Sequence, residues 1–261
     1  MEQKILDQVR AHTPLIHHLT NQVVMNFSAN GLLSFGGTPI MAKYIESAPE
    51  ITTKSNAVLL NMGTLTRIDI ETYVKTGQTA NELGIPVVFD PVGIAGSVFN
   101  KEAGKTILDN VKMDVIKGNA GEMAYLADIP WQTRGVDAIG SGDAEKVALT
   151  VAKKYGTAAV VTGEIDYIAV GKDTFKNRTG HPLLEKITGG GCLLGSIIAA
   201  CLTVKADTIK KIGTAVAFYG LAAQHAANHP QVHGPGTFLP YFIDALSYDI
   251  LDMKEGFSND I

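Results

Sequence analysis

Short runs of consecutive apolar residues alternate along this chain with longer segments whose apolar positions follow a helical period. The apolar runs are residues 57–61, 86–90, 114–119 and 158–163, and each ends in Asn, Asp or Gly. Runs that are apolar throughout predict parallel strands that are covered on both faces. The segments 66–83, 99–111, 120–127 and 143–155 predict helices. This alternation predicts an α/β fold with a mostly parallel central sheet and helices on both of its faces.

The pattern changes after residue 163. Residues 167–170 and 174–178 flank a Gly-Lys-Asp turn and predict an antiparallel hairpin at the edge of the sheet. Three further segments, 191–205, 207–228 and 237–251, predict a helical C-terminal region, and residues 1–12 predict an amphipathic helix. No Pro- or Ser-rich linker divides the chain, so we expect a single domain over residues 1–261.

Composition narrows the class of protein. The net charge is -4 and Lys and Arg never form a run, so we expect no nucleic-acid partner. The most apolar stretch, 193–204, is too short to span a bilayer, and residues 1–12 lack the layout of a secretory signal. The two cysteines, Cys192 and Cys201, would face opposite sides of a helix, which argues against a disulfide. We therefore expect a cytoplasmic protein without a membrane segment.

The predicted strands end in residues suited to phosphate chemistry. In an open α/β sheet, ligands bind beyond the carboxyl ends of the strands. Two carboxylates (Asp90 and Glu122), a cation (Lys117) and a hydroxyl (Thr162) lie at or just after those ends. Phosphoryl transfer uses acids to hold Mg²⁺ or its waters, and a cation and hydroxyls to bind phosphate oxygens. Each residue alone is equally typical of an ordinary turn or cap, but their shared position favours a phosphate site.

The sharpest local signal is a run of three glycines, Gly189, Gly190 and Gly191, that leads into an apolar helix. Backbone N–H groups without side chains can approach an anion closely, and the start of a helix adds positive potential. The run therefore predicts an anion hole for a transferring phosphoryl group; the alternative is a flexible turn before a closely packed helix. Cys192 would lie in the first helical turn, where the pKa of a thiol is lowered, and could help to accept a substrate proton. Its alternative role is that of a small buried apolar residue.

Three other patterns are rejected. The Gly-Lys-Thr at 104–106 resembles part of a Walker A loop, but the leading glycine would have to stand where Phe99 is. The glycine run nearly matches a dinucleotide fingerprint, but Leu194 stands where glycine is required. Three histidines at 225, 229 and 233 have helical spacing, but Pro230 interrupts the helix, so a metal site there is not expected.

Six motifs occur in order along the chain. They are Pro-Leu-Ile-His-His-Leu-Thr-Asn at 14–21, Thr-Pro-Ile-Met at 38–41, Asn-Met-Gly-Thr-Leu at 61–65, Asp-Pro-Val-Gly at 90–93, Gly-Asn-Ala-Gly-Glu at 118–122 and Thr-Gly-Gly-Gly-Cys at 188–192. With these motifs the chain resembles the hydroxyethylthiazole kinase family of the ribokinase-like superfamily over essentially its full length. The resemblance implies ATP-dependent phosphorylation of 4-methyl-5-(2-hydroxyethyl)thiazole, a step of thiamine biosynthesis and salvage, by a homotrimer with active sites between subunits.

The resemblance also implies a role for particular residues. The thiazole pocket would be lined by Asn21, Val23, Met41, Gly63 and Gly189. ATP would be contacted by Lys117, Thr162 and Asn119, and Mg²⁺ would be organised by Asp90 and Glu122, partly through water. The catalytic group would be Gly189, Gly190, Gly191 and Cys192, with Cys192 at the position where most ribokinase-like enzymes carry an Asp base.

Two departures from the family pattern stand out. Gly190 replaces the more usual Thr or Ala, which predicts a more flexible anion hole, and Lys117 replaces the more usual Arg, which turns a bidentate clamp into a point charge. The nearest alternative activity is that of a hydroxymethylpyrimidine or pyridoxal kinase. A nucleotide sensor without turnover is a second alternative, and a dehydrogenase is a distant third because the dinucleotide fingerprint is missing.

Overall fold

In the computed structural model, which describes residues 1–130 and 141–255, eight strands form one sheet in the order β2-β1-β3-β4-β5-β6-β7-β8. The strands are β1 (Leu15–Leu19), β2 (Thr38–Met41), β3 (Ala57–Asn61), β4 (Val87–Asp90), β5 (Val115–Asn119), β6 (Ala158–Thr162), β7 (Asp166–Val170) and β8 (Asp173–Asn177). Strands β2 to β6 along this order pair in parallel, and β7 and β8 are antiparallel. The predicted central strands and the edge hairpin are thus confirmed.

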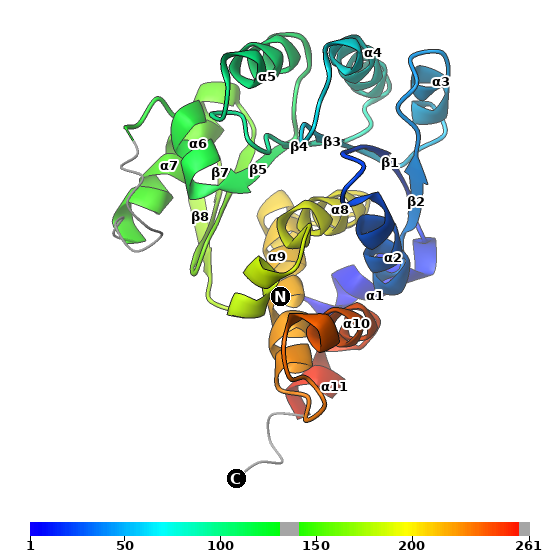
Figure 1. The fold of residues 1–261 in the computed structure, drawn as a ribbon, viewed down its shortest axis with the longest axis vertical. Coiled ribbons are helices and arrows are strands. Elements are labelled where there is room, and N and C mark those ends of the chain that lie inside the picture. Colours follow the sequence, from blue (N-terminus) through cyan, green and yellow to red (C-terminus); the bar gives the residue numbers. More distant parts are fainter. Residues whose placement is uncertain (131–140, 256–261) are drawn as a thin grey trace.

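Helices cover both faces of the sheet (Figure 1). One face carries α3 (Ala48–Thr52), α4 (Arg67–Leu83), α5 (Val98–Asn110), α6 (Ala120–Leu126) and α7 (Ser141–Tyr155); the other carries α2 (Met25–Phe35), α8 (Gly190–Leu202) and α9 (Thr208–Ala227). Farther from the sheet on this second side lie α1 (Gln3–His12), α10 (Pro235–Ala245) and α11 (Ile250–Glu255). The chain passes from β1 to β2 in one direction and adds the later strands in the other, so right-handed crossovers place α2 and α4 on opposite faces.

The two faces have separate apolar cores. Along β3 and β4, Leu59 and Val88 belong to the core under α8, whereas their neighbours Leu60 and Phe89 belong to the core under α4 to α7. Successive side chains of a strand point to opposite faces, so a strand covered on both sides favours apolar residues at consecutive positions. This is why the central strands could be read as unbroken apolar runs.

The sequence pattern did not predict β1 and β2. Strand β1 contains His17 and His18, and both side chains are buried. Their ring nitrogens are paired internally: Nε2 of His17 with the carbonyl of Ala42 at 2.6 Å, and Nε2 of His18 with Oγ of Ser196 at 2.9 Å. Burial lowers the pKa of His18 to about 4, so this residue is a neutral part of the core. Because two of its residues are histidines, β1 lacks the apolar run that marks the central strands, although it is as buried as they are.

The single helix predicted over residues 237–251 is wrong, because the structure has two helices, α10 and α11, in this region. Arg10 of α1 explains the break. Its guanidinium donates to the carbonyls of Leu246 and Tyr248, at 3.3 and 2.7 Å, and forms an ion pair with Asp249. The last carbonyls of a helix need such partners, and a side chain from a distant helix supplies them here.

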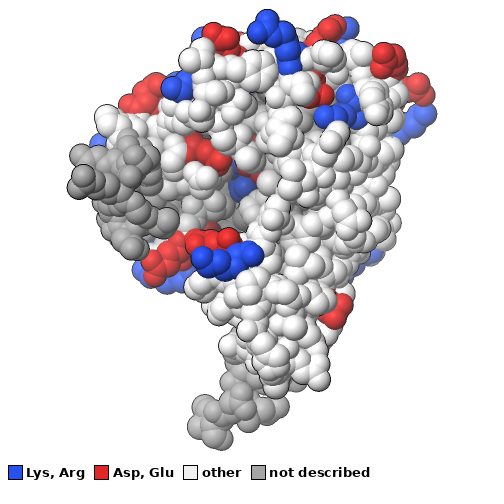
Figure 2. Space-filling view, viewed as in Figure 1, with Lys and Arg blue, Asp and Glu red and all other residues white. Residues whose placement is uncertain are grey.

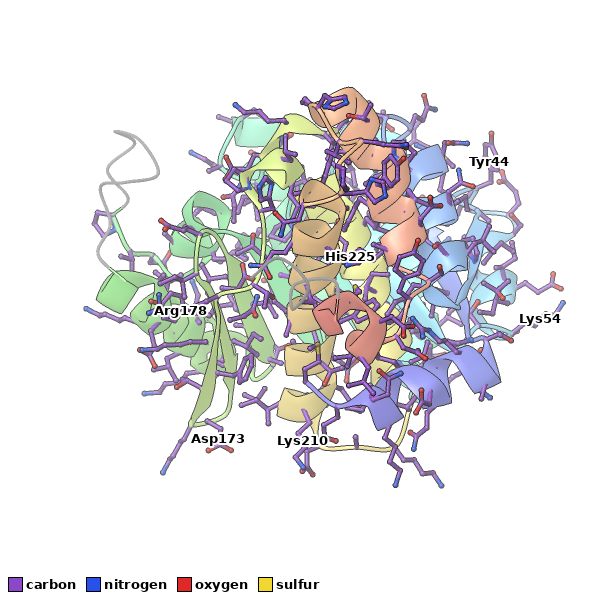
Figure 3. All side chains as sticks on the ribbon, turned by 90° about the horizontal axis from the view of Figure 1, so that it is seen from below. Tyr44, Lys54, Asp173, Arg178, Lys210 and His225 are labelled. Carbon is purple, nitrogen blue, oxygen red and sulfur yellow. The ribbon has the colours of Figure 1, made fainter. Side chains whose placement is uncertain are left out.

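Helix α9 runs toward the edge of the sheet where the parallel strands end. Figure 3 shows Lys210, near its start, at the same end of the molecule as Asp173 in the β7–β8 turn, with His225 farther along the helix. Because β7 is antiparallel to β6, the β7–β8 turn lies at the opposite edge from the carboxyl end of β6. No helix in the described part of the chain has the length and apolar character needed to cross a membrane.

Candidate active site

A buried ion pair lies at the ends of two central strands. Asp90 ends β4, and its Oδ2 lies 3.2 Å from Nζ of Lys117 on β5, with side-chain exposures of 0% and 4%. Burial raises the pKa of Asp90 to about 6, although the charge of Lys117 opposes this. Burial also disfavours the charged form of Lys117, but the nearby negative charges, Asp90 foremost, outweigh it and raise the pKa of Lys117. The pair is a fixed cation and anion in a dry setting, where charges act strongly on a ligand.

Asn61 connects this ion pair to Asn21 and Gly63, two residues of the predicted thiazole pocket. Its Nδ2 donates to Oδ2 of Asp90 at 2.8 Å, and its Oδ1 accepts from Nδ2 of Asn21 and from the backbone N–H of Gly63, both at 3.1 Å. Asn61 is fully buried at the end of β3. Its position at a strand end is evident in the sequence and is as suggestive of a functional residue as that of Asp90, but no role is predicted for it there.

Glu122 and Asn119 form a capping box at the start of α6. The Asn119 side chain accepts from the N–H of Glu122 at 3.0 Å, and Glu122 Oε2 accepts from the N–H of Asn119 at 2.9 Å. The other oxygen of Glu122 accepts from the N–H of Gly93 at 2.8 Å, which ties α6 to the loop after β4. The predicted ATP contact Thr162 lies beside Asn119 in the neighbouring strand, and its hydroxyl donates to the carbonyl of Gly118 at 3.2 Å.

The carboxylates of Asp90 and Glu122 differ in how well they suit Mg²⁺. Within the described residues, Oδ1 of Asp90 is buried without a hydrogen-bond partner, which leaves one carboxylate oxygen for an ion or its water. Both oxygens of Glu122 already accept a backbone N–H, so this residue suits an indirect role through water. The described part of the chain has no cluster of three or more His, Cys, Asp or Glu that could hold a metal. This donor set fits Mg²⁺ that is held mainly by substrate phosphates and waters, not by a protein cage.

The three glycines each meet a different constraint at the start of α8. Gly189 has φ +89°, and a Cβ there would lie 2.7 Å from Cγ1 of Val24. A Cβ on Gly190 would lie 2.8 Å from the carbonyl oxygen of Leu184. A Cβ on Gly191 would lie 3.5 Å from Nζ of Lys117, an ordinary contact. The glycine turn, residues 189–191, therefore lies next to Lys117 of the ion pair.

The surroundings of Gly190 argue against the expectation that it makes the anion hole more flexible. Gly190 is buried, and the backbone of Leu184 approaches it so closely that no side chain fits without a shift. Its carbonyl also accepts a hydrogen bond from the Tyr219 hydroxyl at 2.5 Å. Glycine at this position permits close packing and so fixes the turn.

Cys192 lies in the first turn of α8, as predicted, but its thiol pKa is raised and not lowered. Burial is the main cause and the negative charge of Asp90 adds to it, and together they outweigh Lys117 and the hydrogen bonds from Asn61 and Asn21. The thiol is 4.0 Å from Nδ2 of Asn21. Cys192 is thus a neutral thiol beside Asn21 of the predicted thiazole pocket, not an activated thiolate.

The predicted pocket residues fall into two groups. Asn21 and Gly63 are buried together beside Asn61, and Gly189 lies across from them near Val24. Val23, by contrast, is 66% exposed, and Met41 is half-buried at the end of β2. The single chain therefore builds the inner wall of the predicted pocket and leaves its outer residues uncovered.

Figure 2 shows a hollow in this face of the molecule, near the ends of β4 and β5, with acidic and basic atoms at its base. Two of the rejected patterns, the Gly-Lys-Thr and the histidines, lie outside this site. The Gly-Lys-Thr of 104–106 is inside α5 and cannot form a phosphate loop. His229 stacks on Tyr241 with ring centroids 4.1 Å apart, and His225 packs edge-on against Tyr248 at 5.5 Å, so both have structural partners.

Comparison with known proteins identifies the family. The family model described as "Hydroxyethylthiazole kinase family" matches residues 6–251. The chain is 56% identical to hydroxyethylthiazole kinase 1 of Oceanobacillus iheyensis, with 98% of this chain and 100% of the relative covered. The structure of a hydroxyethylthiazole kinase protein from Pyrococcus horikoshii superposes with a TM-score of 0.85 at 35% identity, covering 94% of this chain and 91% of that one.

A ribokinase-like superfamily protein from Enterococcus faecalis superposes with a TM-score of 0.68 at 15% identity, covering 98% of this chain and 95% of that one. At this identity the likeness concerns the fold alone, and it confirms the predicted ribokinase-like architecture. The family match and the full-length relatives bear on more than the fold. The chain belongs to the hydroxyethylthiazole kinase family.

Proposed function

We propose that this protein transfers the γ-phosphoryl group of ATP to the hydroxyl of 4-methyl-5-(2-hydroxyethyl)thiazole, in thiamine biosynthesis and salvage. The observation that carries the proposal is 56% identity over 98% of the chain to a relative named for this activity. In the reaction, a bond forms between the hydroxyethyl oxygen and the γ-phosphorus. The bond from that phosphorus to the β–γ bridging oxygen breaks, ADP leaves, and the hydroxyl proton passes to a base or to water.

The local geometry supports in-line transfer across the glycine turn. Lys117 is a buried cation within reach of Gly191, where it would neutralise phosphate oxygens, and Thr162 and Asn119 would contact ATP at the neighbouring strand ends. The backbone N–H groups of residues 189–192 would stabilise the moving phosphoryl group. Asp90, and Glu122 through water, would hold Mg²⁺, which supplies charge neutralisation to the triphosphate when bound.

On the acceptor side, Asn21, Val23, Met41, Gly63 and Gly189 would line the thiazole pocket. The buried hydrogen bonds from Asn21 to Asn61 and from Asn61 to Asp90 join this pocket to the phosphate side. Fixed polar groups on both sides hold the two substrates in a reactive orientation, which is the main source of rate in such transfers. The free thiols of Cys192 and Cys201 suit a reducing cytoplasm, where we place the reaction.

The function is tested by substrate-dependent ADP release with Mg²⁺-ATP. The acceptors are hydroxyethylthiazole, hydroxymethylpyrimidine and pyridoxal, each at the same range of concentrations. Preferential turnover of the thiazole, measured as kcat/KM, supports the proposal. Preference for another alcohol would keep the transfer chemistry and replace the acceptor, and ATP binding without ADP release from any acceptor would favour a nucleotide sensor.

Cys192→Ala is expected to lower kcat by roughly ten- to a hundredfold without abolishing turnover, because a neutral thiol positions the acceptor and is not a strong base. The measurement is steady-state kcat with saturating thiazole and ATP. Cys201→Ala is the matched control, since this second thiol is fully buried on the same helix and away from the pocket, and it should leave kcat unchanged. Complete loss of activity in a folded Cys192→Ala variant would assign the thiol a direct chemical role.

We further propose that the whole chain acts as one domain and that three copies assemble with active sites between them. The exposed apolar side chains near the pocket support assembly: Val23, Tyr44 and Ile68 are 66%, 75% and 83% exposed in the single chain. Figure 3 shows Tyr44 pointing away from the body of the molecule. Sedimentation equilibrium should give the mass of three 27.7 kDa chains, and a monomer with full activity would contradict the shared site.

A further inference from the structure

Tyr219 is a buried residue of α9 that has no part in the reaction as described above. It is 4% exposed, and its hydroxyl donates a hydrogen bond to the carbonyl oxygen of Gly190 at 2.5 Å. Helices α8 and α9 pack side by side, so this bond connects the glycine turn to a separate, fully formed helix. A buried phenol usually has a partner, but here the partner belongs to the backbone of the proposed anion hole.

Because a peptide unit is planar, the hydrogen bond to the carbonyl of Gly190 also affects the N–H of Gly191. The carbonyl of Gly190 and the N–H of Gly191 belong to the same planar trans peptide, in which the two groups point in opposite directions. A donor that fixes the direction of the carbonyl therefore also fixes the direction of the N–H. That N–H is one of the groups proposed to bind the moving phosphoryl group, and Gly191 faces Lys117.

The glycine turn needs support of this kind. Residues 189–191 have no side chains, and glycine has the greatest backbone freedom of all residues. Donors stabilise a transition state best when they are already oriented, because no energy is then spent on reorganisation. Two outside contacts restrict the turn: the backbone of Leu184 against Gly190, and the Tyr219 hydroxyl on the carbonyl of Gly190.

The position of Tyr219 is itself fixed. Its ring packs edge-on against Phe242, with centroids 5.0 Å apart and planes at 88°. The next residue, Gly220, lies so close to Thr179 that a Cβ would be 2.5 Å from the Thr179 carbonyl oxygen, and the Thr179 hydroxyl donates to the carbonyl of Ala217 at 2.9 Å. Burial raises the pKa of the Tyr219 phenol well above its usual value, so the phenol stays a donor.

We propose that Tyr219 is a positioning residue for phosphoryl transfer: its hydroxyl orients the peptide between Gly190 and Gly191 and aims the Gly191 N–H at the transferring group. This inference rests on the proposed kinase function. Tyr219 is assigned no contact with either substrate. It acts through the backbone of the glycine turn, so its effect should fall on the transition state and spare ground-state binding.

The test is Tyr219→Phe, which removes one oxygen and keeps the ring against Phe242. We expect kcat to fall about tenfold, less than the loss of a whole oxyanion donor, while KM for thiazole and for ATP stays within about twofold. Tyr241→Phe is the matched control, because its hydroxyl donates to Gln231 away from the glycine turn, and its kcat should stay within about twofold of the wild type. Thermal unfolding of both variants checks that they are folded.

A second readout does not depend on turnover. ADP with aluminium fluoride and Mg²⁺ mimics the planar transferring group, and its binding is measured by calorimetry beside that of ADP alone. We expect Tyr219→Phe to weaken binding of the mimic about tenfold and to leave ADP binding unchanged. The inference is overturned if kcat and mimic binding match the wild type, or if Tyr241→Phe shows the same losses. A wild-type protein that does not turn over the thiazole overturns the proposed function and this inference together.

Discussion

Asp90→Asn is expected to lower kcat with thiazole and Mg²⁺-ATP by about a thousandfold. Among the described residues, Oδ1 of Asp90 is the one buried carboxylate oxygen without a hydrogen-bond partner, and we propose that it serves Mg²⁺ or its water. Its other oxygen balances Lys117 at 3.2 Å and accepts from Asn61 at 2.8 Å. An amide keeps the shape but loses the charge. One substitution would therefore disturb Lys117, the proposed Mg²⁺ site and, through Asn61, the predicted thiazole pocket.

The same substitution should also cost stability. Both side chains of the pair are almost fully buried, so removing the charge of Asp90 leaves Lys117 as an uncompensated buried cation. Breaking a buried pair in this way costs about 3–5 kcal/mol in the free energy of unfolding. Urea unfolding of Asp90→Asn beside the wild type measures this loss, and ligand-free protein should be used so that substrate binding does not mask it.

A double variant separates the two effects. In Asp90→Asn with Lys117→Met, no charge is left unpaired, so most of the lost stability should return, as it does when buried pairs are replaced by apolar groups. Activity should not return, because the double variant lacks both Lys117, the proposed phosphate-binding cation, and the carboxylate of Asp90. Recovery of turnover in the double variant would mean that Asp90 only neutralises Lys117. Wild-type turnover in the single variant would remove Asp90 from the reaction altogether.

The central strands could be predicted because the apolar residues that form them are consecutive in the sequence. Strands β3, β4 and β6 are covered on both faces and are apolar at every position before the last, and the ends of β4, β5 and β6 then place Asp90, Lys117 and Thr162 on one edge. Strand β1 could not be found in this way, because His17 and His18 are buried through partners at Ala42 and Ser196, which are remote in sequence. A hydropathy pattern does not contain such partners.

The pKa of Cys192 could not be predicted from its neighbours in the sequence, because it too depends on residues from distant elements. The start of a helix favours a thiolate, which predicted a lowered pKa for Cys192. The structure adds burial and the charge of Asp90, which arrives from another strand, and the two reverse the sign. The role of Tyr219 likewise depends on α9 returning to the glycine turn from nearly thirty residues farther along the chain.

Gly189→Ala is expected to give the largest loss among the glycines of the turn, about a hundredfold in kcat, with a loss of about 2 kcal/mol in the free energy of unfolding. Gly189 has φ +89°, which disfavours any side chain, and a new Cβ would lie 2.7 Å from Cγ1 of Val24 and 3.2 Å from Cδ1 of Phe27. Relief requires either α2 or the glycine turn to move. Movement of the turn would displace the N–H groups that we propose bind the phosphoryl group.

Gly156→Ala provides the matched control, since it shares the left-handed backbone, at φ +63°, but a Cβ there meets nothing within 4 Å. It should cost about 1 kcal/mol and leave kcat unchanged, so the difference between the two variants measures the contact with Val24 and Phe27. Gly191→Ala separates a contact with Lys117 from strain in the glycine turn. Its Cβ would make only an ordinary contact with Nζ of Lys117, at 3.5 Å, so this variant should fold like the wild type. If Gly189→Ala lost stability but kept its kcat, the fixed geometry of this turn would serve folding and not the transfer of the phosphoryl group.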